Sequence, residues 1–452
     1  MKKKTLLIVF ASLVLSVNSF AGNDPDKNYI RNSVYMIKLN EECVDPDYEE
    51  AFKIMSATFD TINFASNYER YNDFSLNERQ FDFAKLPEVT EEEMDAYGKE
   101  TAVEQLVNDA LRDIGIKNAK SEYEYVAKLM KYFEENKVAQ QLVAKWHNKQ
   151  GVPTTECQWD NDLYTIYELG LKGLSKEAYD NAVATDNLIN LVYGAENKLL
   201  SNTYVCVVRY GYMSAEEVVA VGTALLKSKL NAAPAIARPL IEAGIDKYAS
   251  KIKGYFVRAN AYLFKLDWNE DCYKKFYDNY WENPGAFMDD KSFKLTYVGK
   301  SSKRAPAGLS LKSSTTLDKL IARATMRGTD AAFAALQRDH EEFRPMTSLH
   351  VIDGKLAAYI GMKEGIEVGD KFNVYEAVQS KTDPNMTEWK SIGTIKVAKG
   401  GVWDNRAGAG EHFEGESEDK TDDEKDISSL PYTIFTGKPG KMGEGCMIRL
   451  AK

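Results

Sequence analysis

The stretch TYVCVVRYGYM, residues 203–213, decides the fold of this chain. Its β-branched and aromatic residues suit the pleated, half-buried surface of a strand. Two stretches of the same kind follow, YFVRANAYLFKLDW at 255–268 and FKLTYV at 293–298. Helical periodicity precedes and separates these segments, so the sequence predicts an α+β fold in which helices pack against an antiparallel sheet.

Helical patterns occupy much of the remaining N-terminal and central region. Residues 47–64 and 91–137 repeat apolar side chains at steps of three and four, so we expect helices with one buried face. Residues 215–253 form a further helical stretch that is apolar enough to be considered for membrane insertion. Lys227 and Lys229 interrupt its apolar residues, which favours a buried helical insertion over a membrane span.

The most regular helical pattern is a stripe of five large aromatic residues after a candidate N-cap at Asn269. The stripe consists of Tyr273, Phe276, Tyr277, Tyr280 and Trp281. Aromatic rings on one helix face can bind sugars, but they more often supply the buried area of a domain. We therefore interpret the stripe as part of a core.

From residue 349 the pattern changes to short strands separated by turn residues. The strand candidates are 356–360, 371–378, 389–397, 431–436 and 445–450. Five short strands within about a hundred residues predict a small all-β barrel or sandwich.

The patterns divide the chain into consecutive parts. These are a signal peptide at 1–21, a mixed, mostly helical region at 22–140, an α+β domain with a helical insertion at 141–298, a linker at 299–314, a helical connector at 315–344, and a small β-barrel at 345–452 with an acidic loop at 411–426. The linker is predicted because GKSSKRAPAGLSLKSS lacks apolar periodicity, and the connector is predicted as two helices separated at Gly328. The acidic loop lacks the spacing of a calcium loop and is interpreted as a solvated hairpin tip.

The first residues have the pattern of a secretory signal peptide. Lys2, Lys3 and Lys4 precede a short apolar run, and small residues precede the predicted cut after Ala21. The run is shorter than the roughly 20 residues of a membrane span, which is the rival interpretation. Since Gly22 rather than cysteine follows the cut, no thiol is present there for lipid attachment, and we expect a periplasmic or secreted protein without an integral span in the mature chain.

Charge and cysteine content limit the partners. Loss of three lysines with the leader leaves 55 basic against 68 acidic residues and changes the net charge from −10 to −13. Nucleic acid is therefore not an expected partner. The basic run of Lys300, Lys303 and Arg304 is interpreted as solvated linker.

The five cysteines include no CxxC pair. Because their number is odd, at least one of them has no disulfide partner within a monomer. Cys206 is predicted to be a buried small hydrophobe.

No compact catalytic or cofactor motif is present. The sequence contains no HExxH, GxSxG, GxxxxGK[ST] or strand-linked GxGxxG pattern, and a multi-histidine metal site would need ligands from three regions of the chain. We therefore assign no catalytic, cofactor-binding or metal-ligating residue and expect no cofactor. Asp267, Glu270 and Asp271 beside Trp268 are the best candidates for a pair of glycosidase acids, but an acidic helix start explains them more simply.

Two resemblances add to these patterns. GMKEGIEVGDKFNVYE at 361–376, followed by IGTIKV, resembles the small β-barrel at the end of several Gram-negative envelope assembly proteins, including the flagellar assembly T protein. The segments LVAKWHN, AENKLLSNTYVCVV and LFKLDWNEDCYKKFYDNYWEN resemble uncharacterised exported proteins of anaerobic Gram-negative gut bacteria. The first resemblance covers roughly residues 350 to 450, and the acidic loop departs from it.

The sequence predicts an exported, non-enzymatic envelope protein. We expect a binding, assembly or scaffold role in which the C-terminal β-module docks a protein or glycan partner. The alternative is a glycan hydrolase that uses carboxylates which the sequence does not pair.

Overall fold

The computed structural model describes the chain in segments. They cover residues 29–30, 32–40, 46–62, 79–113, 121–147, 199–232, 254–307, 316–379, 387–407, 409, 427–428 and 430–451. The predicted signal peptide and acidic loop, Cys43 and Cys157 lie outside these segments.

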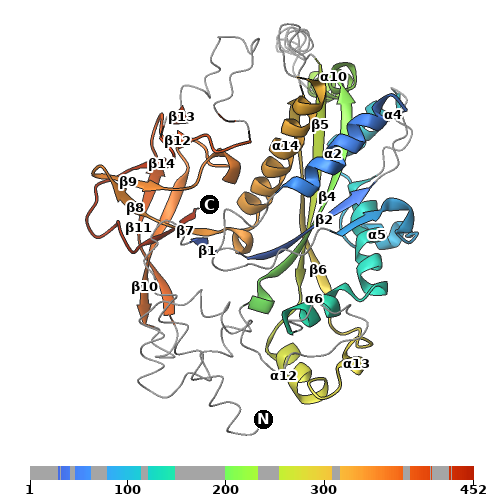
Figure 1. The fold of residues 1–452 in the computed structure, drawn as a ribbon. Helices are drawn as coiled ribbons and strands as arrows, with labels where there is room; N and C mark the ends of the chain where they lie inside the picture. The colour runs from blue at the N-terminus through green and yellow to red at the C-terminus, as the bar shows by residue number, and fades with distance from the viewer. Residues whose placement is uncertain are drawn as a thin grey trace.

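The protein has the predicted α+β fold and contains a five-stranded sheet in the order β3-β2-β4-β5-β6 (Figure 1). The strands are β2 (Ser33–Asn40), β3 (Arg79–Asp82), β4 (Thr203–Ser214), β5 (Tyr255–Leu266) and β6 (Leu295–Ala307). The three strands predicted from the sequence, β4, β5 and β6, are antiparallel neighbours. β2 and β3 add parallel pairs, so one sheet joins residues of the two regions that the sequence analysis separated.

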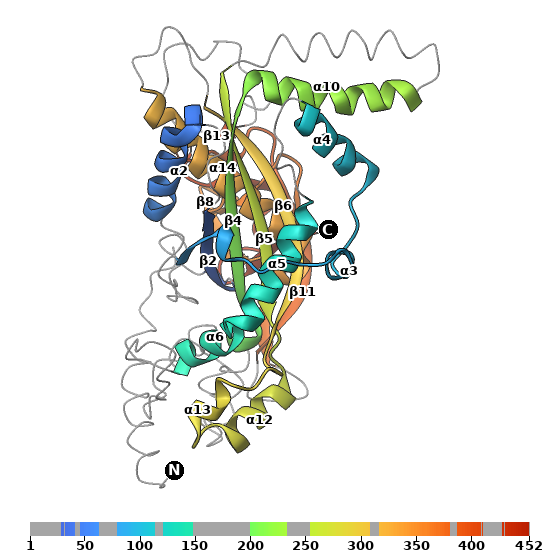
Figure 2. The same cartoon turned by 90° about the vertical axis from the view of Figure 1, so that its right-hand side faces the viewer.

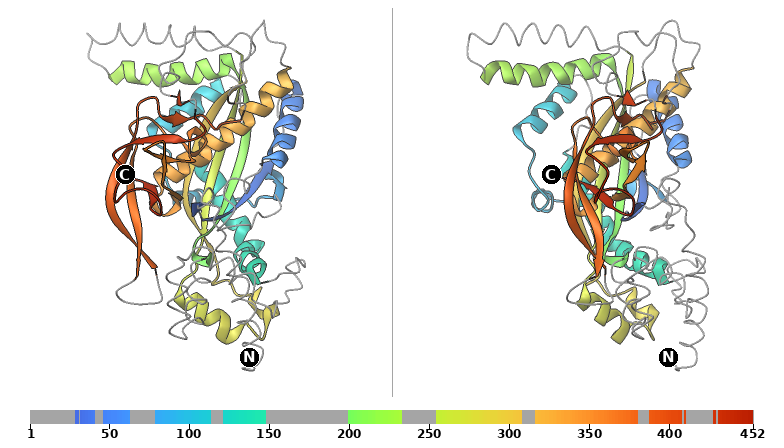
Figure 3. Two further views of the ribbon diagram at one scale, coloured as in Figure 1. Left: turned by 60° about the vertical axis from the view of Figure 1, so that its left-hand side comes forward. Right: turned by 90° about the vertical axis from the view of Figure 1, so that its left-hand side faces the viewer.

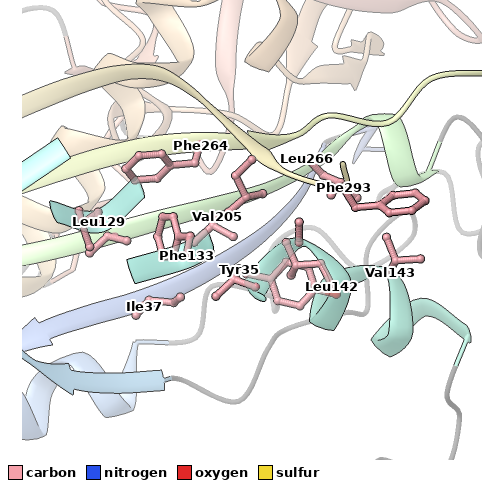
Figure 4. Close-up of a cluster of buried hydrophobic side chains, with 14 of the residues drawn as sticks. Tyr35, Ile37, Leu129, Phe133, Leu142, Val143, Val205, Phe264, Leu266 and Phe293 are labelled. Atoms are coloured by element: carbon pink, nitrogen blue, oxygen red, sulfur yellow. The ribbon is translucent and has the colours of Figure 1, made fainter. Parts of the chain in front are cut away.

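Helices cover both faces of this sheet. α2 (Glu49–Thr61) and α14 (Leu317–Asp339) pack on one face, and α5 (Glu122–Glu135) and α6 (Val138–His147) lie on the other (Figure 2). Side chains alternate along each strand, and the α5 face therefore receives Tyr35, Ile37, Val205 and Phe264 (Figure 4). The opposite face packs Met36, Cys206 and Leu263 with the α14 side chains.

Further helices lie around the sheet. They are α3 (Glu91–Asp95), α4 (Ala102–Asp113), α10 (Ala215–Ala232), α12 (Glu270–Asn279), α13 (Pro284–Phe287), η2 (Pro46–Tyr48) and η3 (Phe83–Lys85). The helix predicted over 91–137 consists of α3, α4 and α5, because Thr90 and Ser121 cap separate helices. Within the described segments no helix combines the length and the apolar character that a membrane crossing requires.

The structure corrects the predicted linker and connector. Residues 299–307 are part of β6, and every one of them is paired with a residue of β5. Their small residues include Ala305 and Ala307, which are buried under α14, so the low apolar content reflects close packing. α14 also continues through Gly328, where a Cβ would lie 3.5 Å from the Ala259 Cβ, and the predicted break is wrong.

The C-terminal part forms the predicted barrel, as a nearly closed antiparallel sheet (Figure 3). Its strands are β7 (Met346–Ser348), β8 (His350–Ile352), β9 (Lys355–Ala358), β10 (Lys371–Gln379), β11 (Thr387–Val397), β14 (Thr433–Thr436) and β15 (Met447–Leu450). The five predicted strands correspond to β9, β10, β11, β14 and β15. β7 and β8 are successive parts of one segment around Leu349 and pair with β15 and β9, so this segment brings the two ends of the sheet together.

Two further strand pairs are only two residues long. β12 (Val402–Trp403) and β13 (Ile427–Ser428) form a parallel pair of their own. β1 (Tyr29–Ile30) pairs with β7, so a segment from the beginning of the chain adds to the barrel.

Charged side chains attach the barrel to α14. The Arg338 guanidinium donates to both carboxylate oxygens of Asp370, at 2.7 and 3.0 Å, and to the Gly365 carbonyl at 2.7 Å. Arg344 donates to the Arg338 carbonyl at 2.6 Å and to the Leu450 carbonyl at 3.4 Å. Two parallel hydrogen bonds from a planar guanidinium fix the orientation of the partner as well as its distance. These contacts therefore hold the barrel in a defined position relative to α14. We call these contacts of Arg338 and Arg344 the arginine clamp.

Candidate functional site

A polar groove of about 440 Å³ lies on the α14 face of the sheet, beyond the end of α14. It is formed by the ends of β5 and β6 together with the turn η6 (Glu341–Phe343) that leads to the barrel. Its polar lining residues include Ser201, Lys265, Asp267, Thr296, His340 and Glu342.

A bulge and a glycine shape the floor of the groove. The register between β5 and β6 shifts at Leu263/Phe264, and Val298 is skipped. The next residue, Gly299, lies under the His340 imidazole, and a Cβ at Gly299 would lie 2.1 Å from His340 Nε2. A strand glycine with this close a neighbour, beside a bulge, is typical of a site where the backbone must admit another group.

The backbone fixes the position of His340. Its N–H donates to the Leu336 carbonyl at 3.1 Å, which ends α14, and its carbonyl accepts from Phe343 N–H at 3.0 Å. The imidazole therefore enters the groove from a defined helix end.

An ion pair forms the second side of the groove. Lys265 Nζ lies 2.8 Å from a Glu342 carboxylate oxygen and 5.6 Å from the centre of the Tyr204 ring. The Glu342 carbonyl accepts from Asn32 Nδ2 at 2.8 Å, which ties this turn to the segment before β2. An ammonium group, two carboxylates, an imidazole and hydroxyls in one open groove are suited to hydrogen bonding with a polar ligand.

The structure separates the acids that the sequence placed together. Asp267 lines the groove, whereas Glu270 and Asp271 lie in the first turn of α12. Asn269 caps that helix by accepting from Cys272 N–H at 3.0 Å, so the helix-start interpretation of this cluster is confirmed. The second acid in the groove is Glu342, which sequence reasoning did not single out, because strand pairing and the turn after α14 bring it near Asp267.

The aromatic stripe belongs to the core, as predicted. Phe276 is fully buried, and the other four residues of the stripe are partly buried against the α5-side cluster. His147 stacks on Phe276 with ring centres 4.9 Å apart, and burial lowers the pKa of His147 to about 3. Trp268 is only 5% exposed and packs on Phe276, so it offers no open ring face to a sugar.

The described segments contain no cluster of three His, Cys, Asp or Glu side chains that could hold a metal ion. Cys206, Cys272 and Cys446 are free thiols. Cys206 is buried as predicted, and burial raises the pKa of its thiol to about 12.

The barrel carries the large apolar side chains that are exposed in the described segments. They are Tyr359, Val368 and Leu430, each 38% exposed. Tyr359 follows β9 and lies edge-to-face with Tyr432, which precedes β14, with ring centres 6.1 Å apart. Leu430 stands two residues before Tyr432 in the chain. We call Tyr359, Leu430 and Tyr432 the tyrosine patch. Val368 lies instead in the turn between Gly365 and Asp370, both of which accept hydrogen bonds from Arg338.

Comparisons with family models and with curated proteins gave no match. No protein-family model matches the chain, and no curated protein matches it at a significant level.

Proposed function

We propose that the chain is an exported, non-enzymatic envelope protein that docks a protein partner through the tyrosine patch of its barrel. The observation that carries the proposal is the exposure of large apolar side chains on the barrel and not on the sheet or helices of the described segments. Exposed aromatic and aliphatic groups that lie together mark interaction surfaces, and tyrosine is enriched in them.

The geometry of the patch favours a protein over a glycan. Sugars stack on an open aromatic face, whereas the rings of Tyr359 and Tyr432 lie at 85° to each other. Leu430 adds an aliphatic group that gains from burial against another apolar side chain. The ring arrangement and the aliphatic side chain of Leu430 therefore both favour a protein as the partner.

The arginine clamp supports a scaffold role. Because Arg338 holds Asp370 with two hydrogen bonds, the patch keeps a defined position relative to the five-stranded sheet. A fixed docking surface loses less entropy on binding than a module on a mobile linker.

Export is part of the proposal and rests on the leader. Lys2 to Lys4, the apolar run and the small residue Ala21 have the order of a cleavable signal peptide. The barrel-like resemblance to envelope assembly proteins agrees with that location. N-terminal sequencing of the protein from a periplasmic or secreted fraction is expected to give Gly22 as the first residue, and a retained leader would contradict export.

Site-specific photocrosslinking in the native envelope tests the docking surface. A photoreactive amino acid at position 359 or 430 of the full chain is expected to link to the same protein species. The same group at position 368 is the matched control, since Val368 is equally exposed but lies beside the clamp. Tyr359→Ser and Leu430→Ser should reduce recovery of that species several-fold, and Val368→Ser should not. Equal linkage at all three positions, or a glycan in place of a protein, would overturn the proposal.

A second candidate function is the carboxylate-dependent glycan hydrolase. It is favoured by one observation, the presence of Asp267 and Glu342 in the same groove. The ion pair of Glu342 with Lys265 speaks against it, because a general acid has to keep its proton. Purified protein that releases reducing ends from envelope glycans, with loss of release in both Asp267→Asn and Glu342→Gln, would establish hydrolysis. Absence of release removes this candidate.

A further inference from the structure

Two side chains in the polar groove beyond the end of α14 keep their hydrogen-bonding capacity for a ligand. The Asp267 carboxylate lines the groove and is half-buried, and it makes no hydrogen bond or ion pair within the described segments. The nitrogens of the His340 imidazole, which also lines the groove, make none within those segments either. A partly desolvated carboxylate without a partner gains from a donor that carries positive charge.

The charges that line the groove favour a cationic ligand. Lys265 and Glu342 compensate each other, because the Lys265 Nζ lies 2.8 Å from a Glu342 carboxylate oxygen. The Asp267 carboxylate then remains as the uncompensated charge of the lining. The chain as a whole is acidic as well, with 68 Asp and Glu against 58 Lys and Arg, and its field therefore attracts cations.

The groove offers acceptors for several hydrogen bonds. Gly299 lets the His340 ring lie against β6, since a Cβ there would be 2.1 Å from Nε2 and 2.5 Å from Cε1. A neutral imidazole has one acceptor nitrogen. The Thr296 hydroxyl donates to the Lys265 carbonyl at 3.4 Å, and its oxygen keeps its own capacity to accept. A carboxylate, an imidazole and a hydroxyl therefore share one groove and call for a ligand that is rich in donors.

We propose that the polar groove binds the primary ammonium group of a small ligand, with Asp267 as its charge partner and His340 and Thr296 as further acceptors. A primary ammonium group has three N–H donors and no acceptor, and it therefore complements these three groups. The groove volume of about 440 Å³ lies within the range of roughly 300–1,000 Å³ that is usual for small-molecule sites. Aliphatic amines and amino sugars both carry such a group. The groove and the tyrosine patch share no residue, so this proposal and the docking proposal fail independently.

Ligand-detected NMR titration of the full mature chain at neutral pH tests the ligand class, because it also measures weak binding. Butylamine is compared with tetramethylammonium, which has the same charge and the same number of heavy atoms but no N–H donor. Glucosamine is compared with N-acetylglucosamine, which keeps the sugar ring and loses the charge. At least one amine should bind at least tenfold more tightly than its matched control, and the tighter amine distinguishes an aliphatic amine from an amino sugar. If neither amine binds, or neither exceeds its control, the proposal is wrong.

The Asp267 carboxylate is tested by a substitution that keeps its shape. Asp267→Asn should weaken binding of the preferred amine at least tenfold. Since this carboxylate has no partner in the described segments, the melting temperature should stay close to that of the native chain. Asp271→Asn is the matched control, because it removes one exposed carboxylate four residues further on, in the first turn of α12, and it should change the affinity less than twofold. Equal loss in the two variants would mean general charge attraction and would overturn the site.

A change at Lys265 tests the sign of the ligand's charge. Lys265→Met removes the ammonium group that occupies Glu342 and keeps an unbranched side chain beside the Tyr204 ring. The groove then holds two uncompensated carboxylates, so the amine should bind several-fold more tightly. Lys274→Met breaks an exposed pair with Glu270 on α12 and is the control, with less than a twofold change expected. Weaker amine binding in Lys265→Met would show that Lys265 itself holds the ligand, and it would overturn the ammonium assignment.

Discussion

A single carboxyl on α14 should make the stability of the protein depend on pH. Burial raises the pKa of Asp330 to about 7, Lys363 opposes this change, and Glu364 adds to it. A carboxyl whose folded pKa lies above its unfolded value stabilises the fold fully below about pH 4, and this stabilisation is lost as the pH rises through 7. The expected loss between pH 4 and 8 is at most about 4 kcal/mol for a pKa change of this size.

Urea unfolding at pH 4.5 and pH 8 measures this contribution. Asp330→Asn cannot ionise, so its free energy of unfolding should change much less between the two pH values than that of the native chain. Asp318→Asn, an exposed change in the first turn of the same helix, is the control and should keep the native pH dependence. If Asp330→Asn keeps the native slope, the carboxyl does not carry the effect.

Residues whose roles are set by their near neighbours in sequence were predictable. The Asn269 cap, the buried Phe276 and the buried Cys206 follow from spacing and from residue type alone. The groove was not predictable, because His340 and Glu342 reach Asp267 only through the β5–β6 register and the end of α14. The sequence analysis singled out Asp267, but it gave no reason to expect His340 and Glu342 beside it.

At the scale of elements, β6 and α14 show how small residues mislead a periodicity argument. Apolar side chains mark a buried strand only when the facing helix leaves room for them. Here α14 lies so close to the sheet that alanine fills the positions of β6 beneath it, and the segment looks like a linker. The strands of the barrel bury larger side chains such as Phe372 and Ile395, and their pattern was clear.

Two substitutions at Gly328 test this close packing. A Cβ would meet the Ala259 Cβ at 3.5 Å and the Ala305 Cβ at 3.8 Å, which is ordinary contact. Gly328→Ala should therefore be neutral or stabilise the protein by up to about 1 kcal/mol, through better helix propensity. Gly328→Leu adds four carbons, three of them beyond the Cβ, where the sheet leaves no room, and should destabilise by about 1–3 kcal/mol. Chemical denaturation of both variants checks the pair, and a tolerated leucine would contradict the close approach of α14 to β5.

At the scale of the whole molecule, the barrel is built into the protein and is not appended to it. α14 packs on the sheet with one side (Figure 1). The arginine clamp joins its end to the barrel. β1, near the beginning of the described chain, pairs with β7 of the barrel. The sequence showed a barrel and an α+β body correctly, but pairings between distant segments decide how the two are joined.

This construction predicts one cooperative unfolding transition for the mature chain. Elements that share a packed interface unfold together, whereas modules on a mobile linker melt separately. Removing the guanidinium in Arg338→Met leaves Asp370 without its paired donor and should cost about 2–3 kcal/mol, because breaking a partly buried pair costs more than an exposed one. Calorimetry should then show the barrel and the body separating into two transitions. Lys53→Met, which breaks an exposed pair with Glu49 on α2, is the control and should keep a single transition. Two transitions in the native chain would show that the clamp does not couple the barrel to the sheet.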